Sequence, residues 1–152
     1  MPADIDFVAY DKDGSVVLLA EAKSQRGTSE KWAAKFRRNM LAHGVLPPAK
    51  YFLIATPERI YVWKNADAQV SERLPEFTLD ATKELKPYFD RVRVPASEIG
   101  HEAFAFLFLS WLTDIAGSGN GGAPVDPAKK WLSDSGLVSS LARARIEMNP
   151  VS

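Results

Sequence analysis

The stretch from Asp4 to Lys23, DIDFVAYDKDGSVVLLAEAK, constrains the fold of this chain more than any other. Two runs rich in β-branched, aromatic and aliphatic residues flank the turn signal DKDG at positions 11–14. This pattern predicts a β-hairpin whose turn is formed by those four residues. The later segments of the chain are then expected to complete a sheet around it.

The charged residues of this hairpin gather at its open end, away from the turn. Side chains on one face of a strand recur at every second position. The first strand therefore places Asp4, Asp6, Val8 and Tyr10 on one side, and the second places Val17, Leu19, Glu21 and Lys23 on one side. With a four-residue turn, simple register sets Asp4 opposite Glu21 and Asp6 opposite Leu19.

A helix is predicted next, with Thr28 or Ser29 as its N-cap and an end near Ala42, before Gly44. Helical spacing predicts a core-facing stripe formed by Trp32, Phe36 and Met40. The basic residues Lys31, Lys35 and Arg38 fall together on another face, with Arg37 beside them.

Two strands are predicted after this helix, at 50–56 and 59–64, and the first is a continuous apolar run typical of a buried strand. A helix between strands of one sheet forms a crossover, so the fold class is α/β with a mixed sheet flanked by helices. Residues 65–75 are polar and irregular. A short helix interrupted by Pro87 is predicted over 81–89, and an apolar helix over 100–116.

The carboxyl-terminal part of the chain divides into a linker and a helical extension. The segment GSGNGGAPVDP at 117–127 has the composition of a flexible linker. Residues 129–146 are predicted to form an amphipathic helix that is interrupted at Gly136 and docks on the sheet. The expected organisation is a core domain at 1–116, the linker at 117–127 and a helical segment at 128–152.

Composition excludes several classes of site. The chain has no cysteine, which excludes disulfides and thiolate metal sites, and its two histidines are too few for a His-based zinc site. The formal net charge of +0 means that nucleic acid must be bound by a local patch. No signal peptide is visible, and the apolar run 103–112 is too short to cross a bilayer. These features predict a cytoplasmic protein without a membrane partner.

An aspartate at a strand start, followed by Glu-x-Lys on the next strand, has a specific chemical use. Hard cations such as Mg²⁺ are commonly held by one or two carboxylates. A bound metal ion polarises a phosphoryl oxygen and lowers the pKa of its water. A lysine on the same face can stabilise the charge that develops on phosphorus. Asp6, Glu21 and Lys23 fit these three roles.

This arrangement resembles the PD-(D/E)XK nuclease superfamily, which has the restriction-endonuclease-like fold and includes domains related to archaeal Holliday-junction resolvases. The resemblance is carried by Asp6, by Glu21-Ala22-Lys23, and by the helix and strand that follow them. It implies a Mg²⁺-dependent or Mn²⁺-dependent DNA nuclease in which Asp6 and Glu21 bind the metal and Lys23 positions water. The family pattern favours Asp6 over Asp4, which is kept as an accessory metal ligand. It also makes a homodimer plausible, because cutting both strands requires two sites.

Each of these features also has a structural interpretation. Glu21 and Lys23 can form a surface ion pair of little energetic value. The basic residues Lys31, Lys35 and Arg38 can be a solvated helix face or a surface that contacts phosphates. The alternative function is accordingly a catalytically inactive module of the same fold that binds DNA or a protein partner.

Overall fold

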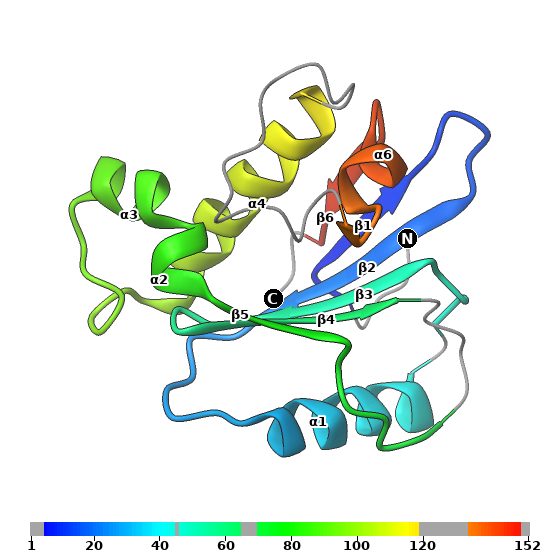
Figure 1. Ribbon diagram of the computed structural model, residues 1–152, viewed down its shortest axis with the longest axis horizontal. Helices are drawn as coiled ribbons and strands as arrows, with labels where there is room; N and C mark the ends of the chain where they lie inside the picture. The colour runs from blue at the N-terminus through cyan, green and yellow to red at the C-terminus, as the bar shows by residue number, and fades with distance from the viewer. Residues whose placement is uncertain (1–4, 45, 65–69, 119–133, 150–152) are drawn as a thin grey trace.

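The structure is a computed structural model that describes residues 5–44, 46–64, 70–118 and 134–149. Over these residues the chain forms a six-stranded sheet with helices on both faces (Figure 1). The strand order is β5 (Phe77–Asp80), β4 (Arg59–Lys64), β3 (Tyr51–Ala55), β2 (Val16–Ala22), β1 (Phe7–Tyr10) and β6 (Arg145–Met148). The central strands β2 and β3 run parallel, and every other neighbouring pair of the sheet is antiparallel. The predicted α/β class with a mixed sheet flanked by helices is confirmed.

The predicted hairpin consists of β1 (Phe7–Tyr10) and β2 (Val16–Ala22). Its loop is one residue shorter than expected, because the Asp11 N–H donates to the Ser15 carbonyl oxygen over 2.9 Å. The Asp11 carboxylate also accepts hydrogen bonds from the amides of Asp13 and Ser15, both at 2.9 Å. Gly14 takes the left-handed conformation, at φ +83°, that closes such a turn.

A β-bulge shifts the hairpin register by a further residue. Tyr10 lies opposite Val16, whereas Ala9 lies opposite Leu18, so Val17 is the extra residue. The sheet has a hydrophobic core on each of its two faces. Val17 packs in one core and Leu19 in the other, contrary to the expectation that they share a face. Together the shorter loop and the bulge bring Asp6 opposite Glu21. The predicted register, which placed Asp6 opposite Leu19, is wrong.

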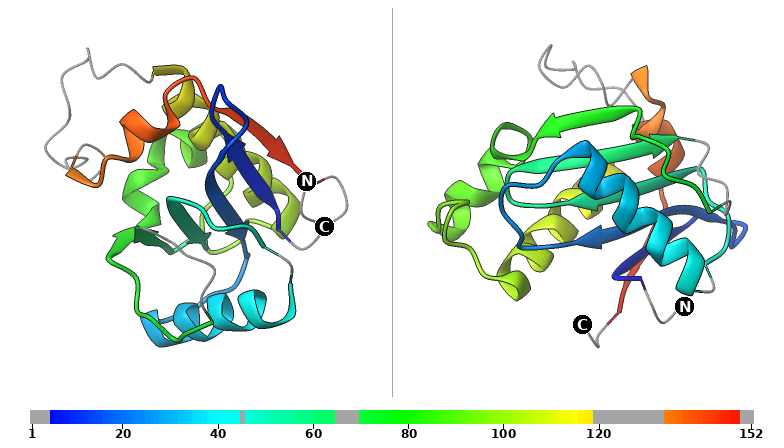
Figure 2. Two further views of the ribbon diagram at one scale, coloured as in Figure 1. Left: turned by 90° about the vertical axis from the view of Figure 1, so that its right-hand side faces the viewer. Right: turned by 90° about the horizontal axis from the view of Figure 1, so that it is seen from below.

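Helix α1 (Glu30–His43) makes the crossover between the parallel strands β2 and β3 (Tyr51–Ala55). Its N-cap is Ser29, whose hydroxyl oxygen accepts the Trp32 N–H at 3.1 Å. Views from the side and from below show α1 as the one described helix on its face of the sheet, with the coil before the fifth strand running beside it (Figure 2). The ends of the predicted helix and strand agree with the structure to within two residues.

The residues of α1 that lie deepest differ from the predicted stripe. Trp32, Phe36 and Met40 are only partly buried, although they do pack on the hydrophobic core between α1 and the sheet. Arg37 is only 1% exposed, and its guanidinium lies 5.6 Å from the ring centroids of both Phe52 and Trp63. The sequence prediction placed Arg37 beside the basic surface, and this is wrong because the aromatic side chains of β3 and β4 enclose it.

The other face of the sheet is covered by α2 (Ala81–Glu84), α3 (Lys86–Val92), α4 (His101–Ser118) and α6 (Leu137–Leu141). The apolar helix α4, predicted to be a buried core helix, is buried on one side only, since Phe104 and Phe108 are buried whereas Phe106 is 51% exposed. Phe108 meets Phe7 of the sheet edge-to-face with centroids 5.5 Å apart. The helix predicted over 81–89 is two short helices, because Pro87 lies in the first turn of α3. None of the described helices is long and apolar enough to span a membrane.

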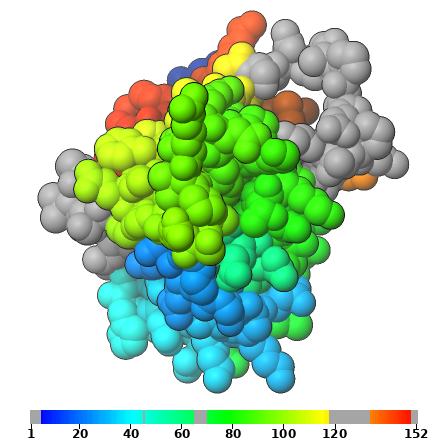
Figure 3. All heavy atoms as spheres, turned by 90° about the vertical axis from the view of Figure 1, so that its left-hand side faces the viewer, coloured from blue at the N-terminus to red at the C-terminus, as the bar shows by residue number. Residues whose placement is uncertain are grey.

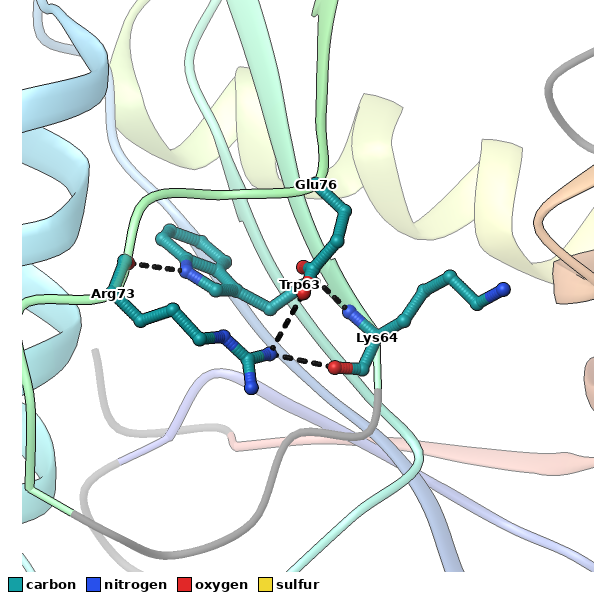
Figure 4. A network of polar contacts seen from close by, with 4 residues as sticks. All are labelled: Trp63, Lys64, Arg73 and Glu76. Carbon is teal, nitrogen blue, oxygen red and sulfur yellow. Dashed lines mark hydrogen bonds and ion pairs between the residues drawn. The ribbon is translucent and has the colours of Figure 1, made fainter.

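Strand β5 (Phe77–Asp80) was not predicted and forms one edge of the sheet beside β4 (Arg59–Lys64). A polar network fastens the segment before β5 to the end of β4 (Figure 4). The Trp63 indole N–H donates to the Arg73 carbonyl oxygen at 2.8 Å, and the Arg73 guanidinium donates to the Lys64 carbonyl oxygen at 2.6 Å. Glu76 accepts the Lys64 N–H at 3.0 Å and pairs with Arg73.

The carboxyl-terminal segment contributes a strand to the sheet and is not only helical. Strand β6 (Arg145–Met148) pairs antiparallel with β1 and forms the other edge. The helix predicted over 129–146 is therefore wrong at its end, and the short helix α6 is its described helical part. This segment docks through the Tyr51 hydroxyl, which donates to the Ser135 carbonyl oxygen at 2.6 Å. Most of the predicted linker lies outside the described residues.

Candidate functional site

The structure brings Asp6, Glu21 and Lys23 together at one end of the sheet. Asp6 immediately precedes β1, Glu21 lies near the carboxyl end of β2, and Lys23 follows that strand. The Lys23 N–H donates to the Ala55 carbonyl oxygen at 2.8 Å, which joins the ends of β2 and β3. The cluster thus lies at the carboxyl ends of two parallel strands, where α/β sheets commonly bind ligands.

The two carboxylates are linked reciprocally through the backbone. The Asp6 N–H donates to Oε1 of Glu21 at 2.8 Å, and the Ala22 N–H donates to Oδ2 of Asp6 at 3.0 Å. Each acid therefore accepts a hydrogen bond from the strand that carries the other. Because backbone groups hold both carboxylates, their separation is set by the hairpin register.

Lys23 completes the cluster with a positive charge. Its Nζ lies 3.5 Å from Oε2 of Glu21, and its side chain is 35% exposed whereas that of Glu21 is 5% exposed. The same ammonium lies 5.1 Å from the centroid of the Phe36 ring on α1. The acid is thus buried beneath a cation that remains in contact with solvent.

Burial raises the pKa of Glu21 from its ordinary value of 4.5 to about 7. The nearby Asp6 carboxylate contributes to this raised pKa, while the Lys23 ammonium and the Asp6 N–H act in the opposite direction. A carboxyl group with this pKa exchanges a proton near neutral pH. This property suits either acid–base chemistry or the binding of a cation in competition with a proton.

The loop that leaves β2 is fixed on two sides of the site. The Gly27 N–H donates to Oε1 of Glu58 at 2.8 Å, and the Arg26 guanidinium donates to the Ile99 carbonyl oxygen at 3.1 Å. Figure 3 looks onto this end of the molecule and shows the loop, in blue, against the turn before β4 and the segment before α4. The loop after β2 is therefore held both by the turn before β4 and by the segment before α4.

The carboxylates of this cluster that could act as ligands of a hard cation belong to two residues. Asp6 and Glu21 supply carboxylate oxygens, and Mg²⁺ in proteins is commonly bound by one or two carboxylates together with water. Within the described parts of the chain, no cluster of three or more His, Cys, Asp or Glu side chains is arranged to hold a metal ion. Asp4, the predicted accessory ligand, lies outside the described residues.

The basic residues of α1 are exposed but lie on a different side of the helix from Lys23. At 100° per residue, Lys35 is about 100° from the Phe36 direction, and Lys31 and Arg38 are about 140° and 160° from it. Phe36 is the α1 residue that contacts Lys23. The basic surface and the carboxylate pair therefore do not lie on the same side of α1.

Two neighbours of the cluster were missed from the sequence. Phe36 was assigned to the core, and only the tertiary structure shows that its ring meets Lys23. The Asn149 N–H donates to the Asp6 carbonyl oxygen at 2.8 Å, so the end of β6 holds the backbone of the first acid. The alternation of charged Arg145 and Glu147 with apolar Ile146 and Met148 is a strand signal that could have revealed β6.

Comparisons of this chain with models of protein families, with curated proteins and with solved structures give no match.

Proposed function

We propose that this protein is a metal-dependent nuclease of the restriction-endonuclease-like class, which hydrolyses phosphodiester bonds in DNA. The observation that carries the proposal is the convergence of Asp6, Glu21 and Lys23 at the carboxyl ends of β2 and β3. The order of β1, β2, α1 and β3 supports it, because this is the order of elements that accompanies the motif in the resemblance. The bulge strengthens the choice of Asp6 by bringing it opposite Glu21.

Asp6 and Glu21 would hold the ion, Mg²⁺ or Mn²⁺. When bound, such an ion supplies a Lewis acid that polarises a phosphoryl oxygen and lowers the pKa of water. The Lys23 ammonium, which is partly exposed, would stabilise negative charge that develops on the phosphoryl group. Burial of Glu21 keeps bulk water away from the pair and thereby strengthens these electrostatic interactions.

The direct test compares wild-type protein with Glu21→Ala and Lys23→Ala. Isothermal titration with Mg²⁺ and Mn²⁺ measures binding, and cleavage of single-stranded, duplex and branched DNA measures activity. Glu21→Ala should lose both, whereas Lys23→Ala should retain metal binding and lose cleavage. Lys12→Ala, in the hairpin turn at the opposite end of β2, is the matched surface control. A wild-type protein that binds no metal and cuts no DNA form would refute the proposal.

The second candidate is a non-catalytic module of the same fold that binds DNA. The observation in its favour is that Lys31, Lys35 and Arg38 are exposed on a side of α1 away from Lys23. There they can contact phosphates without any part being taken by the carboxylate cluster. The test is DNA binding at increasing salt by wild type and by the triple alanine variant. Salt-dependent binding that this variant loses, combined with absence of cleavage, would favour the module.

A further inference from the structure

The ion pair with Glu21 holds the Lys23 ammonium less firmly than a direct charge-assisted hydrogen bond would. The distance of 3.5 Å from Nζ to Oε2 exceeds the usual range of a charge-assisted hydrogen bond, about 2.7–2.9 Å. Lysine also has a flexible four-carbon side chain whose head is free to rotate. The ion pair alone therefore does not fix the ammonium, and a second contact is needed to explain its position.

That second contact is the aromatic ring of Phe36. Nζ lies 5.1 Å from the ring centroid, inside the limit of about 6 Å for a cation–π interaction. The ring attracts the ammonium without accepting its protons in ordinary hydrogen bonds. Lys23 can therefore be held in place while its N–H groups remain available to an anionic oxygen.

The Phe36 ring also contacts a second aromatic ring of α1. The Trp32 ring lies 5.5 Å from it, and Tyr61 of β4 lies 6.2 Å from Trp32, measured between centroids. The Tyr61 hydroxyl shares a 2.7 Å hydrogen bond with the hydroxyl of Thr28, just before α1. These contacts connect the sheet, through Trp32 on α1, to the Phe36 ring that lies against Lys23, and they limit the movement of that ring.

We infer that Phe36 is a positioning residue, which holds the Lys23 ammonium beside Glu21 through its ring face. The inference rests on the proposed nuclease function for its catalytic consequence. Its structural part, the hold on Lys23, can be measured without any activity. Phe36 would then link α1 to the chemistry of the hairpin, a role that core packing alone would not give it.

The experiment places phenylalanine with one, two or three ring fluorines at position 36, beside Phe36→Leu and Phe36→Trp. Fluorine withdraws electron density from the ring face with little change in shape, so these variants keep the packing and weaken the cation–π contact. The first readout is the proton resonance of the Lys23 ε-methylene, which the ring current shifts upfield. The second is kcat and KM for DNA cleavage, with circular dichroism as the check on folding.

The upfield shift should shrink with each fluorine, vanish in Phe36→Leu and survive in Phe36→Trp. kcat should fall in parallel, by about threefold to thirtyfold in Phe36→Leu, with little change in KM. A Lys23 resonance that is unaffected by fluorination or by Phe36→Leu would overturn the inference. A lost shift with unchanged kcat would overturn its catalytic part. A wild type without nuclease activity would refute the proposed function, while the resonance would still decide whether Phe36 holds Lys23.

Discussion

Asp6 and Glu21 each accept a hydrogen bond from the strand that carries the other, at 2.8 Å from the Asp6 N–H and 3.0 Å from the Ala22 N–H. The two carboxylates therefore take the place of ladder carbonyls where the β1–β2 pairing ends. Their proximity is a property of the backbone register, because both hydrogen bonds come from main-chain N–H groups of the hairpin. The pair is preorganised in the sense required of a binding site.

Glu21→Gln should change how stability depends on pH. The pKa of Glu21 is about 7 in the folded protein and near 4.5 in the unfolded chain, so the folded state binds its proton more tightly. The unfolding free energy of wild type should therefore fall as pH rises from 4.5 to 7 and level off above 7. Glutamine does not titrate and should remove this fall. Urea denaturation at closely spaced pH values, without divalent ions, measures the difference.

The control for that experiment is Glu72→Gln, because Glu72 is an exposed acid elsewhere on the chain. This variant should reproduce the wild-type pH profile. Parallel profiles for wild type and Glu21→Gln between pH 4.5 and 7 would contradict the raised pKa of Glu21.

Asp6→Asn should lower the pKa of Glu21 without restoring its ordinary value. The substitution removes the nearby negative charge, while the asparagine side-chain oxygen can still accept the Ala22 N–H. Burial is the larger cause of the raised pKa and remains in the variant. Carbon-13 NMR titration of the Glu21 carboxyl group should therefore give a pKa between 4.5 and 7. A pKa that stays at the wild-type value would show that Asp6 has no electrostatic effect on Glu21.

Tyr88→Phe should remove a stabilising contact whose effect is lost at high pH. The Tyr88 hydroxyl of α3 donates to the Asp114 carboxylate of α4, and burial together with this acid raises the pKa of Tyr88 from 10.0 to about 12. Below pH 10 wild type should be more stable by about 1 kcal/mol. Because the folded pKa is the higher one, the advantage should shrink between pH 10 and 12. Thermal unfolding across that range measures it, and a constant difference would contradict the raised pKa.

The sequence was sufficient for the elements that alternate or repeat strongly. The hairpin runs flank a strong turn signal, β3 is a continuous apolar run, and the crossover helix α1 has apolar residues at helical spacing, and each of these is a local signal. These patterns also placed the charged ends of β1 and β2 together. Element type and the approximate position of the site therefore followed from local rules.

The features that could not be predicted depend on shifts of one residue in strand register and on pairing between segments far apart in the chain. The register of a four-residue turn set Asp4 opposite Glu21, and Asp6 was preferred only on the family resemblance. The three-residue loop and the bulge at Val17 together moved that register and set Asp6 opposite Glu21. A bulge is hard to predict in a run of valines and leucines, because these side chains can pack in the hydrophobic core on either face of the sheet. Strand β6 was missed because its four residues pair with β1, which lies far away in the chain.

Arg37 shows why charge alone does not place a helical residue. Its neighbour Arg38 is exposed, whereas Arg37 is 1% exposed and its guanidinium lies 5.6 Å from the ring centroids of both Phe52 and Trp63. Arg37→Ala should therefore lower the unfolding free energy by about 3 kcal/mol, because it empties a buried volume and removes both ring contacts. Arg38→Ala is the matched control and should change it by no more than about 0.5 kcal/mol.

Urea denaturation followed by tryptophan fluorescence measures both arginine variants under one set of conditions. Arg37→Met adds a decisive comparison, since methionine refills most of the volume without the charge. If packing is the main contribution of Arg37, methionine should recover most of the lost stability. If the cation–ring contacts dominate, Arg37→Met should remain close to Arg37→Ala. Equal losses for Arg37→Ala and Arg38→Ala would show that Arg37 is not enclosed by the β3 and β4 rings.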